Sequence, residues 1–288
     1  ALIVLEVGLG GRLDAVNLVD ATVAVITSVD LDHQDWLGDT IAAIATEKAG
    51  VMRTGRPVVF GEREPHAVLL ARAAALGAPI WIKGRDYDFS DSDATGQWRW
   101  QTGQTCYEGL PLPRVVCDNA ATAIAALHAL ADVTELRVSA VALQQGLPQA
   151  FVTGRLQRLP CLTEVWLDVG HNPHGARFLW QHLPKSLPGQ RTHAVFAMLQ
   201  DKDVAGVIAA SAEQVDCWWL ADLTGPRGQT AARLAEQLQA QLCNPCLGGQ
   251  FATVEQAFNA ARQALNSNDR IVVFGSFLTV AAVLSAGA

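Results

Sequence analysis

The chain has 288 residues, half of them hydrophobic, and a formal net charge of −7. This length suits one large domain or two of ordinary size, with ample material for a core. Nucleic-acid binders need a basic face, so the acidic balance argues against that class. No apolar run approaches the roughly 18 to 20 residues of a membrane span, and no basic-plus-apolar leader opens the chain. We expect a cytoplasmic protein without nucleic-acid or membrane partners.

In the first half, apolar runs predict strands and alanine-rich or leucine-rich runs predict helices. Strands are expected at 2–7, 23–29, 57–61 and 79–83, and helices at 40–50, 66–76, 118–130 and 138–146. Asp118 and Asn119 offer a polar start to the third of these helices. Between the second and third helices, residues 87–113 alternate aromatic with polar residues and predict antiparallel hairpins. Strand–helix alternation predicts a mostly parallel sheet.

After a linker at 148–155, the alternation begins again. Strands are expected at 164–168, 193–198, 217–220 and 270–274, and helices at 174–183, 203–210, 229–242, 253–265 and 278–284. Thr253 and Gln256 have the spacing of a capping box. We therefore predict two α/β domains, 1–150 and 151–288.

The cysteines offer little support for a metal site. They are Cys106, Cys117, Cys161, Cys217, Cys243 and Cys246. Only the last two have C-x-x-C spacing, and no second pair matches them, so ordinary reduced thiols are expected.

Residues 8–14, Gly-Leu-Gly-Gly-Arg-Leu-Asp, follow the first expected strand. They lack the third glycine of a dinucleotide fingerprint, so an ordinary glycine-rich turn is the simpler interpretation. Glu6 interrupts the apolar run before them and needs a cation or hydrogen bonds if it is buried. His33 follows the second expected strand, and Lys48 lies near a helix end. Since ligands bind at the carboxyl ends of parallel strands, Glu6, His33 and Lys48 are expected to face one crevice.

A second polar segment, Asp-Val-Gly-His-Asn-Pro, spans residues 168–173. Asn172 is suited to cap the next helix, and Pro173 to its first position. A capped turn explains neither Asp168 nor His171. Both are expected at the end of a strand beside a helix N-terminus, which favours anions.

Taken together, these segments resemble the folylpolyglutamate synthase/dihydrofolate synthase family of the Mur-ligase superfamily. The resemblance covers essentially the whole chain at residues 5–15, 31–38, 47–50, 119–122, 154–155, 168–173 and 275–277. It implies part of a P-loop-type ATPase domain, followed by a smaller Rossmann-like domain that binds glutamate.

The implied reaction is ATP-dependent amide formation. A carboxylate is phosphorylated by ATP, and the amino group of L-glutamate attacks the acyl phosphate. The resemblance implies dihydropteroate as acceptor, and tetrahydrofolate in a bifunctional enzyme. ATP and two Mg²⁺ ions are the implied cofactors, and the implied state is a monomer.

Site roles are implied by the same resemblance. Glu6, His33 and a carbamylated Lys48 match magnesium ligands, and Leu13, Asp14 and Ala15 match part of the pterin-binding loop. Asn119, Arg155 and Asp168 match the nucleotide contacts, with Arg155 reaching the phosphates. Asp168, His171 and Ser276 match the glutamate side of the site, where Asp168 and His171 join Lys48 as catalytic candidates.

One departure concerns the phosphate-binding loop G-x-x-x-x-G-K-[ST], which is absent from the 288 residues. In the family this loop lies upstream of the strand that opens the chain. The sequence therefore suggests an N-terminally truncated fragment, which we expect to be inactive alone because the β- and γ-phosphates lose their main site.

Three alternatives remain at this point. A Mur-type ligase of cell-wall precursors shares the superfamily. A nicotinamide-dependent oxidoreductase predicts NADH binding without ATP dependence. A non-catalytic remnant predicts a folded 151–288 region without ligand affinity.

Overall fold

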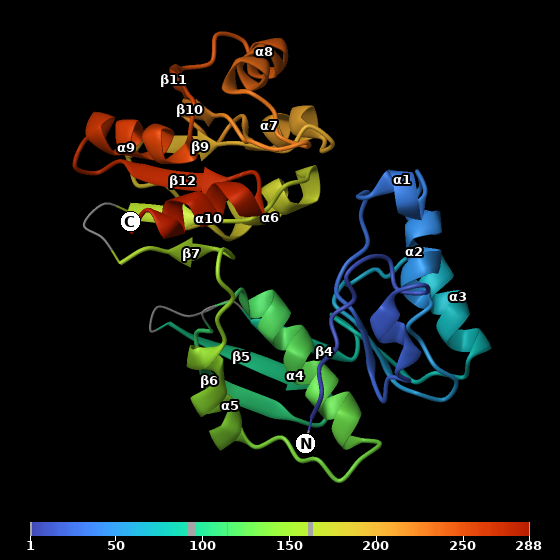
Figure 1. Ribbon diagram of the computed structural model, residues 1–288. Coiled ribbons are helices and arrows are strands. Elements are labelled where there is room, and N and C mark those ends of the chain that lie inside the picture. The colour runs from blue at the N-terminus through green and yellow to red at the C-terminus, as the bar shows by residue number, and fades with distance from the viewer. Residues whose placement is uncertain (1, 91–95, 114, 161–163, 288) are drawn as a thin grey trace. The chain divides into compact units, whose positions relative to one another are not determined.

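The computed structural model describes residues 2–90, 96–113, 115–160 and 164–287, and Cys161 lies outside this part. The chain forms two compact units, Ala1–Phe151 and Val152–Ala288. Figure 1 colours the first from blue to green and the second from yellow to red. No helix among the described residues combines the length and apolar character needed to cross a membrane.

The first unit contains a three-stranded parallel sheet in the order β1-β2-β3. Its strands are β1 (Ala24–Ile26), β2 (Val58–Phe60) and β3 (Ile80–Ile82). Helix α2 (Ile41–Ala49) connects β1 to β2, and α3 (Ala67–Ala75) connects β2 to β3. The short η1 (Ala15–Leu18) precedes β1, and the short α1 (Gln34–Leu37) lies between β1 and α2. The expected strands at 23–29, 57–61 and 79–83 and both helices are thus confirmed, with shorter ends.

The expected strand at 2–7 is wrong. These residues adopt no regular structure, and Ile3 and Val4 are 79% and 84% exposed. A β-strand needs a neighbour for its backbone groups. None of the strand pairs of the described chain includes residues 2–7. Apolar, β-branched composition alone therefore did not decide the conformation here.

The hairpin region forms a separate antiparallel sheet, as expected, in the order β4-β5-β6. It comprises β4 (Tyr87–Ser90), β5 (Gln97–Thr102) and β6 (Cys106–Pro111), and α4 (Cys117–Ala131) and α5 (Ala140–Gly146) follow, then the short η2 (Leu147–Gln149). Buried Trp98 and Trp100 share a hydrophobic cluster with Ile124 and Ala125 of α4. Helix α4 begins without a side-chain cap, because Val116 occupies the N-cap position and Asp118 lies inside the first turn.

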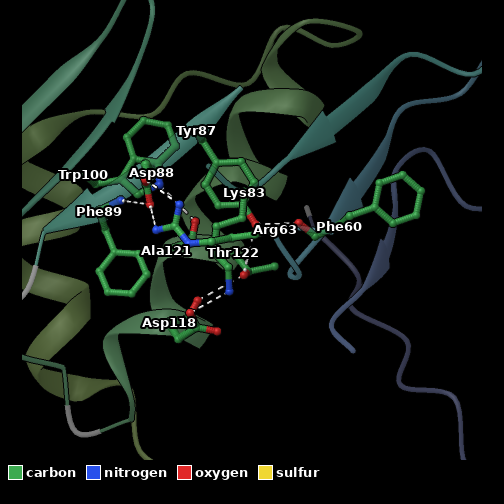
Figure 2. A network of polar contacts seen from close by, with 10 residues as sticks. All are labelled: Phe60, Arg63, Lys83, Tyr87, Asp88, Phe89, Trp100, Asp118, Ala121 and Thr122. Atoms are coloured by element: carbon green, nitrogen blue, oxygen red, sulfur yellow. Dashed lines mark hydrogen bonds and ion pairs between the residues drawn. The ribbon is translucent and has the colours of Figure 1, made fainter. Parts of the chain in front are cut away.

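A network of polar contacts ties the two sheets of this unit to α4 (Figure 2). Lys83 Nζ lies 2.6 Å from the Asp118 carboxylate, and only 9% of the Lys83 side chain is exposed. The Tyr87 hydroxyl donates to Phe60 O at 2.9 Å and lies 3.2 Å from Thr122 Oγ1. These contacts fix the start of α4 against β2 and β3.

We expect Tyr87→Phe to lower the free energy of unfolding by about 1 to 2 kcal/mol. The buried Phe60 carbonyl loses the nearer of its two donors and keeps only the longer bond from Lys83 N, at 3.4 Å. Burial raises the pKa of Tyr87 to about 12. Its hydroxyl therefore stabilises the fold fully below the unfolded pKa of about 10, and this contribution disappears as pH rises toward 12. Urea unfolding checks the first value and phenolate absorbance the second. Tyr107→Phe is the matched control, since the Tyr107 hydroxyl is only part-buried; an equal loss there would contradict the prediction.

The second unit is a six-stranded sheet in the order β11-β10-β9-β12-β8-β7. The strands are β7 (Gln157–Arg158), β8 (Glu164–Leu167), β9 (Thr192–Phe196), β10 (Cys217–Ala221), β11 (Leu247–Phe251) and β12 (Arg270–Phe274). All pairs are parallel except β7 with β8. The four expected strands are confirmed, whereas the edge strands β7 and β11 were not predicted.

Helices cover both faces of this sheet. They are α6 (Pro173–His182), α7 (Val204–Ser211), α8 (Ala231–Gln241), α9 (Val254–Ala264) and α10 (Phe277–Ser285). One hydrophobic cluster joins α6, α7 and α8 to the sheet, and the other joins α9 and α10 to it. All five expected helices are confirmed, and Thr253 caps α9 by accepting from Gln256 N at 3.2 Å.

Candidate functional site

In the first unit, the glycine-rich loop rests on the C-terminal turn of α2. Arg12 N donates to Glu47 O at 2.9 Å, and the Arg12 guanidinium pairs with the Glu47 carboxylate. A Cβ on Gly50 would lie 2.4 Å from Arg12 Cβ, so only glycine permits this approach. The loop is therefore held against the helix turn that carries Lys48.

Asp14 organises the loop from within. Its carboxylate accepts hydrogen bonds from the backbone N–H groups of Gly8, Leu9 and Val16 at 2.9 to 3.0 Å. These bonds, led by the one from Leu9, lower the pKa of Asp14. Leu13, in contrast, is 79% exposed, and Ala15 is also exposed. Leu13 and Ala15 are thus presented to solvent by a loop that Asp14 shapes.

Lys48 lies half-buried among carboxylates at the carboxyl ends of the parallel strands. Burial lowers the pKa of Lys48, while the negative charges of Asp32 and Glu62 raise it. Asp32 follows β1 and Glu62 follows β2, and Glu62 Oε1 accepts from Val29 N at 3.3 Å. Lys48 and two carboxylates therefore share this sheet edge.

His33 adjoins this group in an unusual backbone conformation. Its φ of 52° lies in the left-handed region, its N–H donates to Asp32 Oδ1 at 2.8 Å, and its Nε2 lies 3.8 Å from Asp32 Oδ2. Strained φ values of this kind cluster at functional sites.

Glu6 differs from the expectation of a carboxylate buried in a strand. It belongs to the irregular segment 2–7 and is exposed. Among the described residues, Glu6 makes no hydrogen bond or ion pair with either His33 or Lys48. No contact in the described part of the chain therefore supports the predicted role of Glu6 as a metal ligand.

Asn119 occupies the first turn of α4 and is exposed, next to the Lys83–Asp118 pair. Backbone N–H groups without helical partners point outward at this end of a helix and favour anions. The position thus suits a contact with a charged ligand.

In the second unit, Asp168 pins two turns together. It follows β8, is 4% exposed, and accepts from Leu156 N at 3.0 Å and Gly170 N at 2.7 Å. Burial raises the pKa of Asp168, whereas these amides and the charges of Arg155 and His171 lower it. Asn172 caps α6 by accepting from Gly175 N at 2.7 Å, with Pro173 in the first turn, as predicted.

Phe277 links the other predicted residues of this unit. Its ring lies 6.0 Å from the Arg155 guanidinium carbon and 5.9 Å from the His171 ring. The Asp168 carboxylate interacts electrostatically with both Arg155 and His171. Arg155, Asp168, His171 and Phe277 therefore form one cluster at the carboxyl ends of β8 and β12.

Ser276 belongs to the same edge, but its hydroxyl caps α10. It accepts from Thr279 N at 3.0 Å and lies 2.7 Å from Thr279 Oγ1, which donates to Ala197 O. Only 3% of Ser276 is exposed.

Sequence reasoning missed three of these side chains as site residues. Asp32 and Glu62 surround Lys48, and Phe277 bridges Arg155 and His171. Their positions after the strands were the available signal, since parallel strands deliver ligand-binding groups there.

Comparison with known proteins shows which family the chain resembles. Residues 154–277 match the family described as Mur ligase, glutamate ligase domain. Dihydrofolate synthase/folylpolyglutamate synthase of Escherichia coli is 43% identical over 284 residues, covering 98% of this chain and 64% of the relative. The Haemophilus influenzae protein of that name is 37% identical, covering 97% of this chain and 67% of the relative. The chain thus spans about two thirds of the length of these relatives.

Solved structures match along the same length. Escherichia coli FolC in complex with DHPP and ADP is 42% identical with a TM-score of 0.87, covering 98% of this chain and 65% of that one. The bifunctional Yersinia pestis enzyme with AMPPNP and Mn is 44% identical with a TM-score of 0.87, at the same coverage. The shared sequence and fold lead to one conclusion: the chain belongs to the dihydrofolate synthase/folylpolyglutamate synthase family of Mur ligases.

Proposed function

We propose that the protein is an ATP-dependent ligase that adds L-glutamate to dihydropteroate and also to tetrahydrofolate. The observation that carries the proposal is Lys48, half-buried beside Asp32 and Glu62 and under the loop that presents Leu13. Relatives support the ligands: one solved structure holds DHPP and ADP, and another holds Mn, AMPPNP and L-glutamate.

The residues around Lys48 fit a carbamate and a divalent cation. Carbamate formation requires a neutral amine, which a lowered pKa favours, and burial lowers the pKa of Lys48. The product would place a third negative charge beside Asp32 and Glu62, an arrangement that a hard cation stabilises. Carbamylated Lys48, His33 and Asp32 would hold Mg²⁺, together with Glu6 if the 2–7 segment brings it near. Bound Mg²⁺ offsets the negative charge of phosphates.

The proposed roles of the other residues follow from their chemistry. Leu13 and Ala15 offer an apolar surface to a pterin ring, while Asp14 holds their loop. Arg155 donates to phosphate oxygens, and its stacking on Phe277 restricts its orientation. Asn119 contacts the nucleotide at the start of α4.

The residues proposed to bind and activate glutamate belong to the second unit. Asp168 positions the turns that carry Arg155 and His171, and burial favours its protonated form. His171 Nδ1 lies 3.0 Å from Val169 O, which can only accept, so Nδ1 carries a proton and Nε2 is the ring nitrogen that would contact the substrate. Since its hydroxyl caps α10, Ser276 would shape the glutamate pocket through its backbone. Attack of the glutamate amine on the acyl phosphate then releases phosphate.

In this proposal, residues 1–150 form the C-terminal part of the ATPase domain and residues 151–288 the glutamate-binding domain. The match of residues 154–277 to the glutamate ligase domain supports the second assignment. From the resemblance to the family, we also propose that the protein is a cytoplasmic monomer.

The test is phosphate release from ATP by the full-length product of the gene that encodes this chain. L-glutamate and Mg²⁺ are supplied with dihydropteroate or with tetrahydrofolate. We expect release with both acceptors and none without glutamate. Release with dihydropteroate alone would remove the second activity. A folded protein that is silent with both acceptors but active on a cell-wall nucleotide precursor would overturn the folate assignment.

A further inference from the structure

Two free thiols meet at the edge of the six-stranded sheet, away from the carboxyl-end cluster. Cys217 opens β10, and Cys246 directly precedes β11. Trp218 pairs with Leu247, and Trp218 N donates to Cys246 O at 2.9 Å, so the two cysteines are neighbours across the strands. Their Sγ atoms lie 2.8 Å apart.

The backbone geometry suits a covalent link. Neighbouring strands lie about 4.7 to 4.9 Å apart, within the Cα separation of about 4.4 to 6.8 Å that disulfides span. The side chains already point toward each other. A bond could therefore form with little movement of either strand.

We propose that Cys217 and Cys246 form a thiol–disulfide exchange site, oxidised by a low-molecular-weight disulfide such as glutathione disulfide. The Cys246 thiolate attacks one sulfur of the reagent, forms a mixed disulfide and releases one glutathione thiolate. The Cys217 sulfur then attacks Cys246 Sγ, its proton passes to the departing thiolate, and the second glutathione leaves. Two protein thiols are oxidised and one reagent disulfide is reduced to two thiols.

The order of these steps follows from exposure. Cys246 is exposed and can meet the reagent, whereas Cys217 is 4% exposed and cannot. Burial raises the pKa of Cys217 to about 12, with the neighbouring Cys246 adding to the shift. Cys217 is therefore a poor first nucleophile, but it lies in place for the second, intramolecular step.

The disulfide would stabilise the edge of the sheet. Within the described part of the chain, strand β11 pairs on one side only, and its pairing with β10 shifts register between Trp218 and Trp219. Gly248 and Gly249 contribute no side chains to hold it. A disulfide at Cys246, directly before β11, would tie this weak edge to the neighbouring β10 (Figure 1) and protect it from unpairing.

The test is exchange of the folded full chain with glutathione disulfide, followed by alkylation and peptide mapping. We expect a peptide that joins Cys217 to Cys246 and is lighter by two hydrogen atoms than the two reduced peptides together. Cys243→Ser is the matched control, because Cys243 is exposed and only three positions away; it should react as the wild type does. Cys217→Ser should instead retain glutathione on Cys246.

Three results would overturn the proposal, and all can be read from the wild type without any variant. They are a Cys243–Cys246 disulfide, a lasting glutathione adduct on Cys246, and no loss of thiols.

Discussion

Replacing Lys48 with alanine is expected to lower the rate of ATP-dependent phosphate release about a thousandfold, the scale for loss of one preorganised charge-stabilising group. The reason is local: in the proposed site, the carbamate of Lys48 would complete an anionic, metal-binding set with Asp32 and Glu62, and the change removes it. Folding should be unaffected, since Lys48 is only half-buried. The measurement is the glutamate-dependent assay on the full-length protein.

Lys48→Arg separates the two roles open to this lysine. Arginine keeps the positive charge but does not form the carbamate, so we expect the same loss as with alanine. Acetate should partly restore Lys48→Ala by supplying a carboxylate. Full activity in Lys48→Arg would show that the residue acts as a cation. Lys185→Ala, at an exposed position of the second unit, is the control and should retain full activity.

Gly275→Ala is expected to lower the free energy of unfolding of the second unit by about 4 kcal/mol, through backbone strain and overpacking together. Gly275 has a φ of 112°, and a Cβ there would lie 2.6 Å from Ala197 O and 2.9 Å from the Phe196 ring. Both neighbours are fully buried, Phe196 at the end of β9 and Ala197 directly after it. Urea unfolding, followed by hydrogen exchange in peptides from 152–288, measures the loss.

Gly189→Ala is the matched control. Gly189 also has a positive φ, 78°, but a Cβ there meets no atom within 4 Å. Its cost should be about 1 kcal/mol, the left-handed backbone penalty alone. Equal losses at both positions would show that conformation, and not close packing, dominates at Gly275.

The elements that could be predicted from sequence are those whose causes are local. Thr40, Asn172 and Thr253 each cap the helix that follows them, through a hydrogen bond to a residue three positions on. Such bonds depend on neighbours in the chain, so residue type and spacing suffice. Strands depend on distant partners. The run at 2–7 has suitable composition but pairs with no strand of the described chain, and β11 pairs despite its two central glycines.

The same distinction between local and distant causes decides which site residues could be predicted. Asp168, His171 and Lys48 were candidates because each belongs to a short, recognisable segment. Asp32 and Glu62 were missed because their relation to Lys48 arises from three separate segments that meet at one sheet edge. Asp14 was predicted as a substrate contact, yet its carboxylate is occupied by three backbone amides. A sequence pattern indicates that a polar residue matters, but not whether it serves the ligand or the loop.

The close contact between Gly50 and Arg12 has a thermodynamic consequence. Because the loop and the last turn of α2 touch through their backbones, neither can shift without the other. A ligand that immobilises Leu13 would therefore also restrict Lys48, and the chemical state of Lys48 would change the affinity of that ligand. Linkage makes the two effects equal in free energy. In the proposed site, acceptor binding at Leu13 and carbamylation of Lys48 would thus be energetically coupled, each changing the free energy of the other by the same amount.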